Sequence, residues 1–107
     1  MYRQYVEERT NDHVLETDKG FATYTFVDDK TVYIRDIFVL EEHRAWGNAS
    51  KMADQIAEIA KQKGCTKMLG SVQPSAKGST ESAKVLLAYG MSVKSAFQDA
   101  IWFEKDL

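Results

Sequence analysis

The segment HRAWGNAS, residues 43–50, combines a fixed positive charge with small residues and a hydroxyl group. Arg44 offers a fork of guanidinium donors, Gly47 and Ala49 leave the backbone accessible, and Ser50 adds a hydroxyl. If a helix begins here, its first turn also presents unpaired backbone N–H groups and the positive end of the helix dipole. The segment therefore predicts a site for a phosphate group. The alternative is a tight strand-to-helix turn that needs Gly47 for its backbone and binds nothing, but such a turn does not call for Arg44 and Ser50 together.

The flanking residues predict the elements that position this loop. Residues 31–39 are rich in β-branched and aromatic side chains, which favours a strand, and residues 49–63 are rich in helix formers. Apolar residues recur at helical spacing in the second segment and predict the face that packs on the sheet: Met52, Ile56, Ile59 and Ala60. Gly64 should end the helix, and residues 65–72 should form a strand parallel to the first, because a helix crosses between them.

The rest of the chain predicts further strands and one more helix. Residues 13–16 and 21–27 read as a hairpin that continues into the strand at 31–39 as an antiparallel meander. After a loop at 73–80, a Ser or Thr N-cap opens a helix at 81–89, which Gly90 ends. Two short strands follow, at 91–97 and 100–105. The first ten residues fit either an edge strand or a short helical turn.

Composition limits the class of protein. The chain has 107 residues, 44% of them hydrophobic and 28% charged, so we expect a single globular domain over residues 1–107. A formal net charge of −2 does not predict the positively charged surface that binding of nucleic acid requires. No apolar run approaches a membrane span and no signal peptide is evident, so we expect a soluble, cytoplasmic protein without a membrane partner. The single Cys65 excludes an internal disulfide and is expected to be a small buried residue at a strand start.

Arg44-x-x-Gly47-x-Ala49 resembles the Arg/Gln-x-x-Gly-x-Gly/Ala signature of the Gcn5-related N-acetyltransferases (GNAT family). Residues 33–52 are similar to that family's strand 4, loop and helix 3 over their whole length. The resemblance implies an α/β (α+β) fold, a mixed and mainly antiparallel sheet with a βαβ unit that binds acyl-coenzyme A. It also implies an N-acetyltransferase that moves an acetyl group from acetyl-coenzyme A (acetyl-CoA) to a primary amine. That amine would be a small molecule or a protein lysine or N-terminus, attacking directly in a ternary complex.

The resemblance also implies which residues hold the cofactor. The pyrophosphate would lie on the loop and first helical turn, at Arg44, Ala45, Trp46, Gly47, Asn48, Ala49 and Ser50. The thioester would lie beside the peptide groups near Ile37, Phe38 and Val39, although the side chains of Phe38 and Val39 should belong to the core. Thr80 stands where the family has an Asn that contacts the pantetheine arm. No metal site is predicted.

Two residues of the strand at 31–39 are candidates for catalysis. Asp36 interrupts a face formed by Val32, Ile34 and Phe38, so it must be paired or face a cavity. It could act as a base through water, or pair with Arg35 or with a basic residue of a neighbouring strand; the sequence leaves both open. Tyr33 could donate a proton, or simply pack.

Two departures from the family pattern bear on activity. The family's usual general acid is a helical Tyr four residues before a Gly, and that position is Leu86 here, with Tyr89 three residues further on. Family members also usually carry two helices between their first two strands, whereas residues 1–10 precede the first hairpin here. The resemblance thus implies a minimal version whose acceptor site is open, or is completed by the acceptor or by a second subunit in a homodimer. The alternative function is a cofactor-binding or protein-interaction module that catalyses weakly or not at all.

Overall fold

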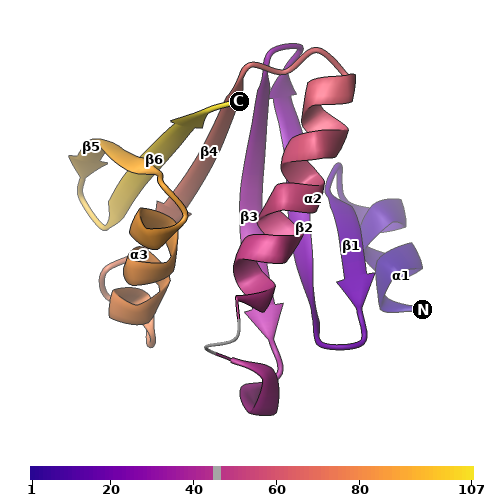
Figure 1. Cartoon of the computed structure of the whole chain (residues 1–107), viewed down its shortest axis with the longest axis horizontal. Helices are drawn as coiled ribbons and strands as arrows, with labels where there is room; N and C mark the ends of the chain where they lie inside the picture. The colour runs from indigo at the N-terminus through magenta and orange to yellow at the C-terminus, as the bar shows by residue number, and fades with distance from the viewer. Residues whose placement is uncertain (45–46) are drawn as a thin grey trace.

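The computed structural model describes residues 1–44 and 47–107 and folds them into a mixed sheet flanked by helices (Figure 1). Each of the predicted strands and helices is present, with small shifts at the ends. The helices of the described residues are α1 (Tyr2–Arg9), α2 (Asn48–Gln62) and α3 (Ser79–Ala88), with a short 3-10 turn at Glu41–His43. The strands are β1 (His13–Thr17), β2 (Gly20–Asp28), β3 (Thr31–Val39), β4 (Lys67–Val72), β5 (Ser92–Phe97) and β6 (Ala100–Asp106).

The six strands form one sheet in the order β1-β2-β3-β4-β6-β5. Only β3 and β4 pair in parallel, and the other four neighbouring pairs are antiparallel, which confirms the predicted mixed sheet with a βαβ unit. Both crossovers, through α2 and through α3, carry the chain in the same direction across the sheet. Because such crossovers are right-handed, α2 and α3 lie on the same face, and α1 lies behind β1 on the other face (Figure 1).

The core lies between α2 and the middle of the sheet. Met52, Ile56 and Ala60 of the predicted helix face are buried, and Ile59 is partly buried against the same cluster. They meet the largest fully buried side chains of the sheet, which are Val32, Met68 and Phe103. Burial of this apolar face holds α2 against β3. The N-terminus of α2 is therefore fixed near the C-terminal end of β3.

A β-bulge at Arg35 changes which residues of β3 face the core. Tyr24 of β2 pairs with Ile34 and the preceding Thr23 pairs with Asp36, so the register shifts between these pairs and Arg35 has no partner. Beyond the bulge, Val39 is buried and Ile37 packs on the core, whereas Asp36 and Phe38 are exposed.

Two predictions for this strand are therefore wrong. Asp36 does not interrupt the face formed by Val32 and Ile34, because the extra residue at the bulge moves it to the opposite face. Phe38 is not a core side chain: it is 42% exposed and stacks on Phe21 of β2, with 5.6 Å between ring centroids.

β3 and β4 pair over three residues and then separate. The pairs join Thr31–Tyr33 to Lys67–Leu69, and the pairing stops there although both strands continue. From Gly70 on, β4 pairs with β6 alone, up to Val72 opposite Ile101. The two strands diverge toward the end of β3 that leads into α2 (Figure 1).

The structure also decides the form of the N-terminal segment and corrects the start of the second predicted helix. Residues 2–9 form a helix, which decides between the two structures that residues 1–10 allowed. The second helix starts at Ser79, and its N-cap is Gly78 in the left-handed conformation (φ 80°), so the predicted Ser or Thr cap is wrong. The Ser79 hydroxyl instead donates to the carbonyl oxygen of Pro74 at 2.9 Å.

Within residues 1–44 and 47–107, no helix is both long enough and apolar enough to cross a membrane.

Gly20 allows β2 to approach β3 closely. A Cβ added there would lie 2.0 Å from the carbonyl oxygen of Phe38. We expect Gly20→Ala to lower the free energy of unfolding by about 1–3 kcal/mol, because the backbone of either strand must shift. Urea denaturation measures this change, and Asp18→Ala in the adjacent turn should change stability by less than about 0.5 kcal/mol. Equal stability of Gly20→Ala and the unsubstituted protein would contradict the close approach.

Candidate functional site

The first turn of α2 presents backbone amides without helical partners. Gly47 is the N-cap, in the left-handed conformation (φ 78°), and no side chain caps the helix. The first intrahelical bond runs from Lys51 N to the Gly47 carbonyl oxygen at 3.0 Å, so the N–H groups of residues 48–50 precede the helical ladder. Gly47 is exposed, and a Cβ there would meet no atom within 4 Å. We call the open space beside Gly47 and the amides of residues 48–50 the anion hollow. Its unpaired amides can accept an anionic group.

Two side chains hold the loop before α2. Asn48 Nδ2 donates to the His43 carbonyl oxygen at 2.8 Å, and Arg44 Nε donates to the Val39 carbonyl oxygen at 2.9 Å. The Arg44 guanidinium also lies over the Phe38 ring, 5.7 Å from its centroid. Arg44 is exposed and keeps further N–H donors on the fork, so it places positive charge beside the hollow. The predicted cofactor residues Ala45 and Trp46 lie outside the described residues.

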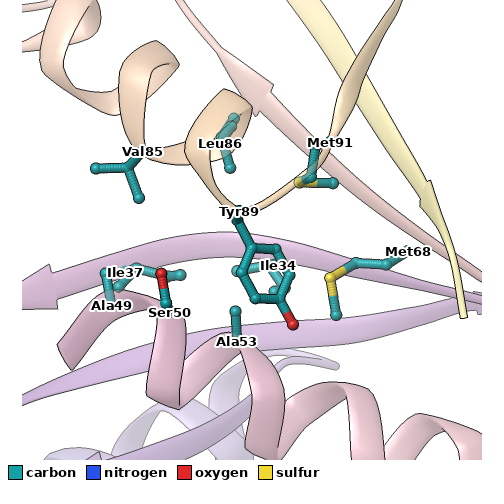
Figure 2. Close-up of a pocket in the computed structure, with 10 residues that line it drawn as sticks. All are labelled: Ile34, Ile37, Ala49, Ser50, Ala53, Met68, Val85, Leu86, Tyr89 and Met91. Atoms are coloured by element: carbon teal, nitrogen blue, oxygen red, sulfur yellow. The ribbon is translucent and has the colours of Figure 1, made fainter. Parts of the chain in front are cut away.

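A narrow apolar pocket continues from the α2 N-terminus to the place where β3 and β4 separate. Figure 2 shows it between α2, α3 and β3. Its lining is almost entirely apolar and consists of Ile34, Ile37, Ala49, Ser50, Ala53, Met68, Val85, Leu86, Tyr89 and Met91. Because Ala49 and Ser50 belong to both the pocket and the first turn of α2, the anion hollow and the pocket adjoin. The pocket has a volume of only about 10 Å³, so a ligand arm can enter it only when α2 and α3 move apart, whereas the adjoining amides of α2 suit an anionic group as they stand.

Leu86 of α3 and Tyr89, the residue that follows this helix, both line the pocket. Leu86 packs above Gly70 of β4, where its Cδ2 would lie 3.4 Å from an added Cβ. The Tyr89 ring projects into the pocket in Figure 2. Its hydroxyl donates to Asp54 Oδ1 at 2.7 Å. Burial, together with the hydrogen bond to Asp54 and the charge of that carboxylate, raises the pKa of Tyr89. The proton therefore stays on the Tyr89 oxygen, in the hydrogen bond to Asp54, and is poorly available for transfer.

The two catalytic candidates lie on the opposite face of the sheet from α2. Asp36 is exposed, and its Oδ2 accepts a hydrogen bond from the Thr23 hydroxyl at 2.9 Å. Arg35 does not pair with it: Arg35 Nε donates to Asp12 Oδ2 at 2.9 Å. The Tyr33 hydroxyl and the Ser71 hydroxyl are 2.7 Å apart.

The structure thus brings together part of the predicted site. Arg44 and residues 47–50 lie at the N-terminus of α2, and Arg44 is bonded to the Val39 carbonyl oxygen at the end of β3. Thr80 is exposed in the first turn of α3 and is not among the residues lining the pocket. Ser71 and Trp102, on β4 and β6, were not predicted. Alternation along a strand can assign a residue such as Ser71 to one face, but only the register between strands reveals its neighbours.

A mixed sheet whose two parallel strands diverge beside an open helix N-terminus is the architecture of an acyl-coenzyme A N-acyltransferase. Residues 7–84 match the family model described as the acetyltransferase (GNAT) family, so this chain belongs to that family.

Individual relatives agree with this assignment. Thialysine N-epsilon-acetyltransferase of Sus scrofa is 35% identical over 51 residues, which span 44% of this chain and 30% of the relative. PaiA N-acetyltransferase of Thermoplasma acidophilum in complex with coenzyme A superimposes with a TM-score of 0.78 at 13% identity, over 94% of this chain and 64% of that one. A GNAT acetyltransferase of Elizabethkingia anophelis with acetyl-CoA bound gives 0.75 at 15% identity, over 98% and 83%. At such identities the two structures indicate a common fold.

Proposed function

We propose that this chain is an acetyl-CoA-dependent N-acetyltransferase that acts by direct attack of a primary amine in a ternary complex. The main observation is that β3 and β4 separate after Tyr33 and Leu69 and open toward the unpaired amides of α2. A thioester arm needs such an opening, and a diphosphate needs such amides. The coenzyme A complexes of the structural neighbours add support.

In this proposal the cofactor lies along β3. Its diphosphate binds the amides of residues 48–50 and the free donors of Arg44. Its pantetheine arm runs along the opening between β3 and β4, beside the small apolar pocket, and Thr80 lies in the first turn of α3. The peptide groups near Ile37, Phe38 and Val39 orient the thioester carbonyl, because β3 has no partner strand on that side beyond Tyr33. The thioester supplies an activated acetyl group.

The amine approaches from the opposite face. Asp36 is exposed there, and the Thr23 hydroxyl fixes the orientation of its carboxylate. It takes the proton of the attacking amine through a water molecule. The acceptor is a primary amine of a small molecule or of a protein, in keeping with the thialysine acetyltransferases among the relatives.

Binding and transfer are measured separately to test this proposal. Isothermal titration with acetyl-CoA should show binding, and mass spectrometry should show addition of one acetyl group to a member of a panel of thialysine, polyamines, lysine peptides and free N-termini. Binding without transfer to any amine would favour the alternative, a cofactor-binding module, which is motivated by Leu86 and by the Tyr89–Asp54 bond. No binding would overturn both.

Asp36→Asn tests the proposed base. The amide keeps the size of the side chain and an acceptor for Thr23 but cannot take up a proton. We expect the rate of transfer to fall about 100-fold while the Kd for acetyl-CoA changes less than about twofold. Asp29→Asn, an exposed carboxylate in the β2–β3 turn, is the matched control and should transfer at the original rate. An unchanged rate in Asp36→Asn would assign the base elsewhere.

A further inference from the structure

Tyr33 and Ser71 form a hydroxyl pair across β3 and β4, at the point where their pairing ends. Tyr33 is the last residue of β3 that pairs with β4, opposite Leu69. Ser71 lies two residues beyond Leu69 on the same face of β4. The 2.7 Å hydrogen bond between the two hydroxyl oxygens therefore crosses the narrow end of the opening, and either oxygen can be the donor.

Three strands fix this pair in place. The Tyr33 ring lies 5.4 Å from the Trp102 ring of β6 and 5.3 Å from the Arg35 guanidinium. Arg35 is itself held by Asp12, and Trp102 is the cross-strand partner of Ser71. Both hydroxyl-bearing residues are partly buried. Such a position gives a proton donor a fixed direction while leaving it access to solvent.

Among the described residues that line the pocket, none offers a free hydroxyl near this point. Leu86 is apolar and packs above Gly70. The Tyr89 hydroxyl donates to Asp54, and Ser50 lies at the far end of the pocket, in the first turn of α2. Ser71 and Tyr33 instead place a fixed pair of hydroxyls at the opening between β3 and β4.

We propose that Ser71 donates a proton to the thiolate that leaves in the transfer reaction and that Tyr33 resupplies it; this inference rests on the proposed function. As the amine nitrogen bonds to the acetyl carbon, the C–S bond breaks and its electron pair stays on sulfur. The sulfur takes the Ser71 Oγ proton, and Ser71 takes the Tyr33 hydroxyl proton. Tyr33 regains a proton from solvent, and the proton lost by the amine leaves through Asp36. The products are the acetylated amine and free coenzyme A.

Ser71→Ala tests the donor. We expect kcat to fall about 100-fold, the usual scale for loss of a general acid, while the Kd for acetyl-CoA stays within about twofold. Ser71→Thr keeps a hydroxyl and should retain most of the activity. Ser95→Ala is the matched control. Ser95 lies on β5 and also pairs with Trp102, but on the side of β6 away from Ser71, so this variant should keep the original kcat.

Tyr33→Phe tests the relay and keeps the ring that packs against Trp102. It should lower kcat to a similar extent, and the double variant should be no slower than either single one, because both act on one proton. Should Ser71→Ala fail to fold, Tyr33→Phe and Ser71→Thr still decide the question.

The outcomes separate this inference from the proposed function. If the unsubstituted protein is active and Ser71→Ala or Tyr33→Phe keeps its kcat, the proton relay is overturned. The proposed acetyltransferase function is then unaffected. Equal losses of acetyl-CoA binding and of kcat would indicate a structural bridge and also overturn it. Absence of transfer by the unsubstituted protein would instead overturn the proposed function.

Discussion

Replacement of Gly47 by valine is expected to weaken binding of acetyl-CoA about 100-fold. The added side chain would stand at the mouth of the hollow, where a Cβ has no neighbour within 4 Å, and would keep the diphosphate from the amides of residues 48–50. Hydrogen bonds to charged groups contribute about 1.5–3 kcal/mol each, so loss of two of them at the lower end of this range corresponds to about two powers of ten in Kd. Isothermal titration measures the change.

Gly64→Val is the matched control for this variant. Gly64 lies just beyond the other end of α2, also with positive φ (89°) and with no atom within 4 Å of an added Cβ. Valine in the left-handed conformation should cost each variant about 1–2 kcal/mol of stability. Only Gly47→Val should lose affinity. Equal affinities in the two variants would show that the diphosphate does not lie on the α2 N-terminus.

Phe103→Ala should give the largest loss of stability, about 3–5 kcal/mol. Phe103 is 2% exposed and lies on β6 opposite Gly70 of β4 and Val93 of β5, within the core. Its removal leaves a cavity beneath the part of the sheet that carries Ser71 and Trp102. A loss of this size is a large fraction of the stability of a small domain. Urea denaturation, monitored by tryptophan fluorescence, measures it.

Phe97→Ala provides the comparison on the neighbouring strand. Phe97 is 76% exposed at the end of β5, so its removal should change the free energy of unfolding by less than about 0.5 kcal/mol. Similar losses in Phe97→Ala and Phe103→Ala would mean that the β5–β6 hairpin packs differently from the structure described here.

Much of the fold and the phosphate-binding loop could be predicted from the sequence, because local signals carry them. The strand at 31–39, the loop with Arg44 and Gly47, and the following helix each depend on residues close together in the chain. Positive φ at Gly47 and the apolar face of α2 follow from such residues. The Ser or Thr cap predicted for α3 is wrong because the helix starts earlier, at Ser79, so that Gly78 is the N-cap and no side chain caps the helix.

The arrangement of Asp36, Tyr33 and Ser71 on the face of the sheet opposite α2 could not be predicted from the sequence in the same way. Strict alternation placed Asp36 beside Val32 and Ile34, but one extra residue at Arg35 reverses the alternation for the rest of β3. No signal within β3 reveals this bulge, because it is defined by pairing with Thr23 and Tyr24 of another strand. The same limit hid the contact between Tyr33 and Ser71, which lie 38 positions apart in the chain.

The sequence by itself determined the order of strands and helices, the helix N-terminus that suits an anion, and the family resemblance that the comparisons bear out. The tertiary structure decided which side chains share a face and which hydroxyls meet. It also decided where β3 and β4 separate. The physical reason is range: capping, turns and helical periodicity act over a few residues, whereas strand register and separation follow from packing among distant segments.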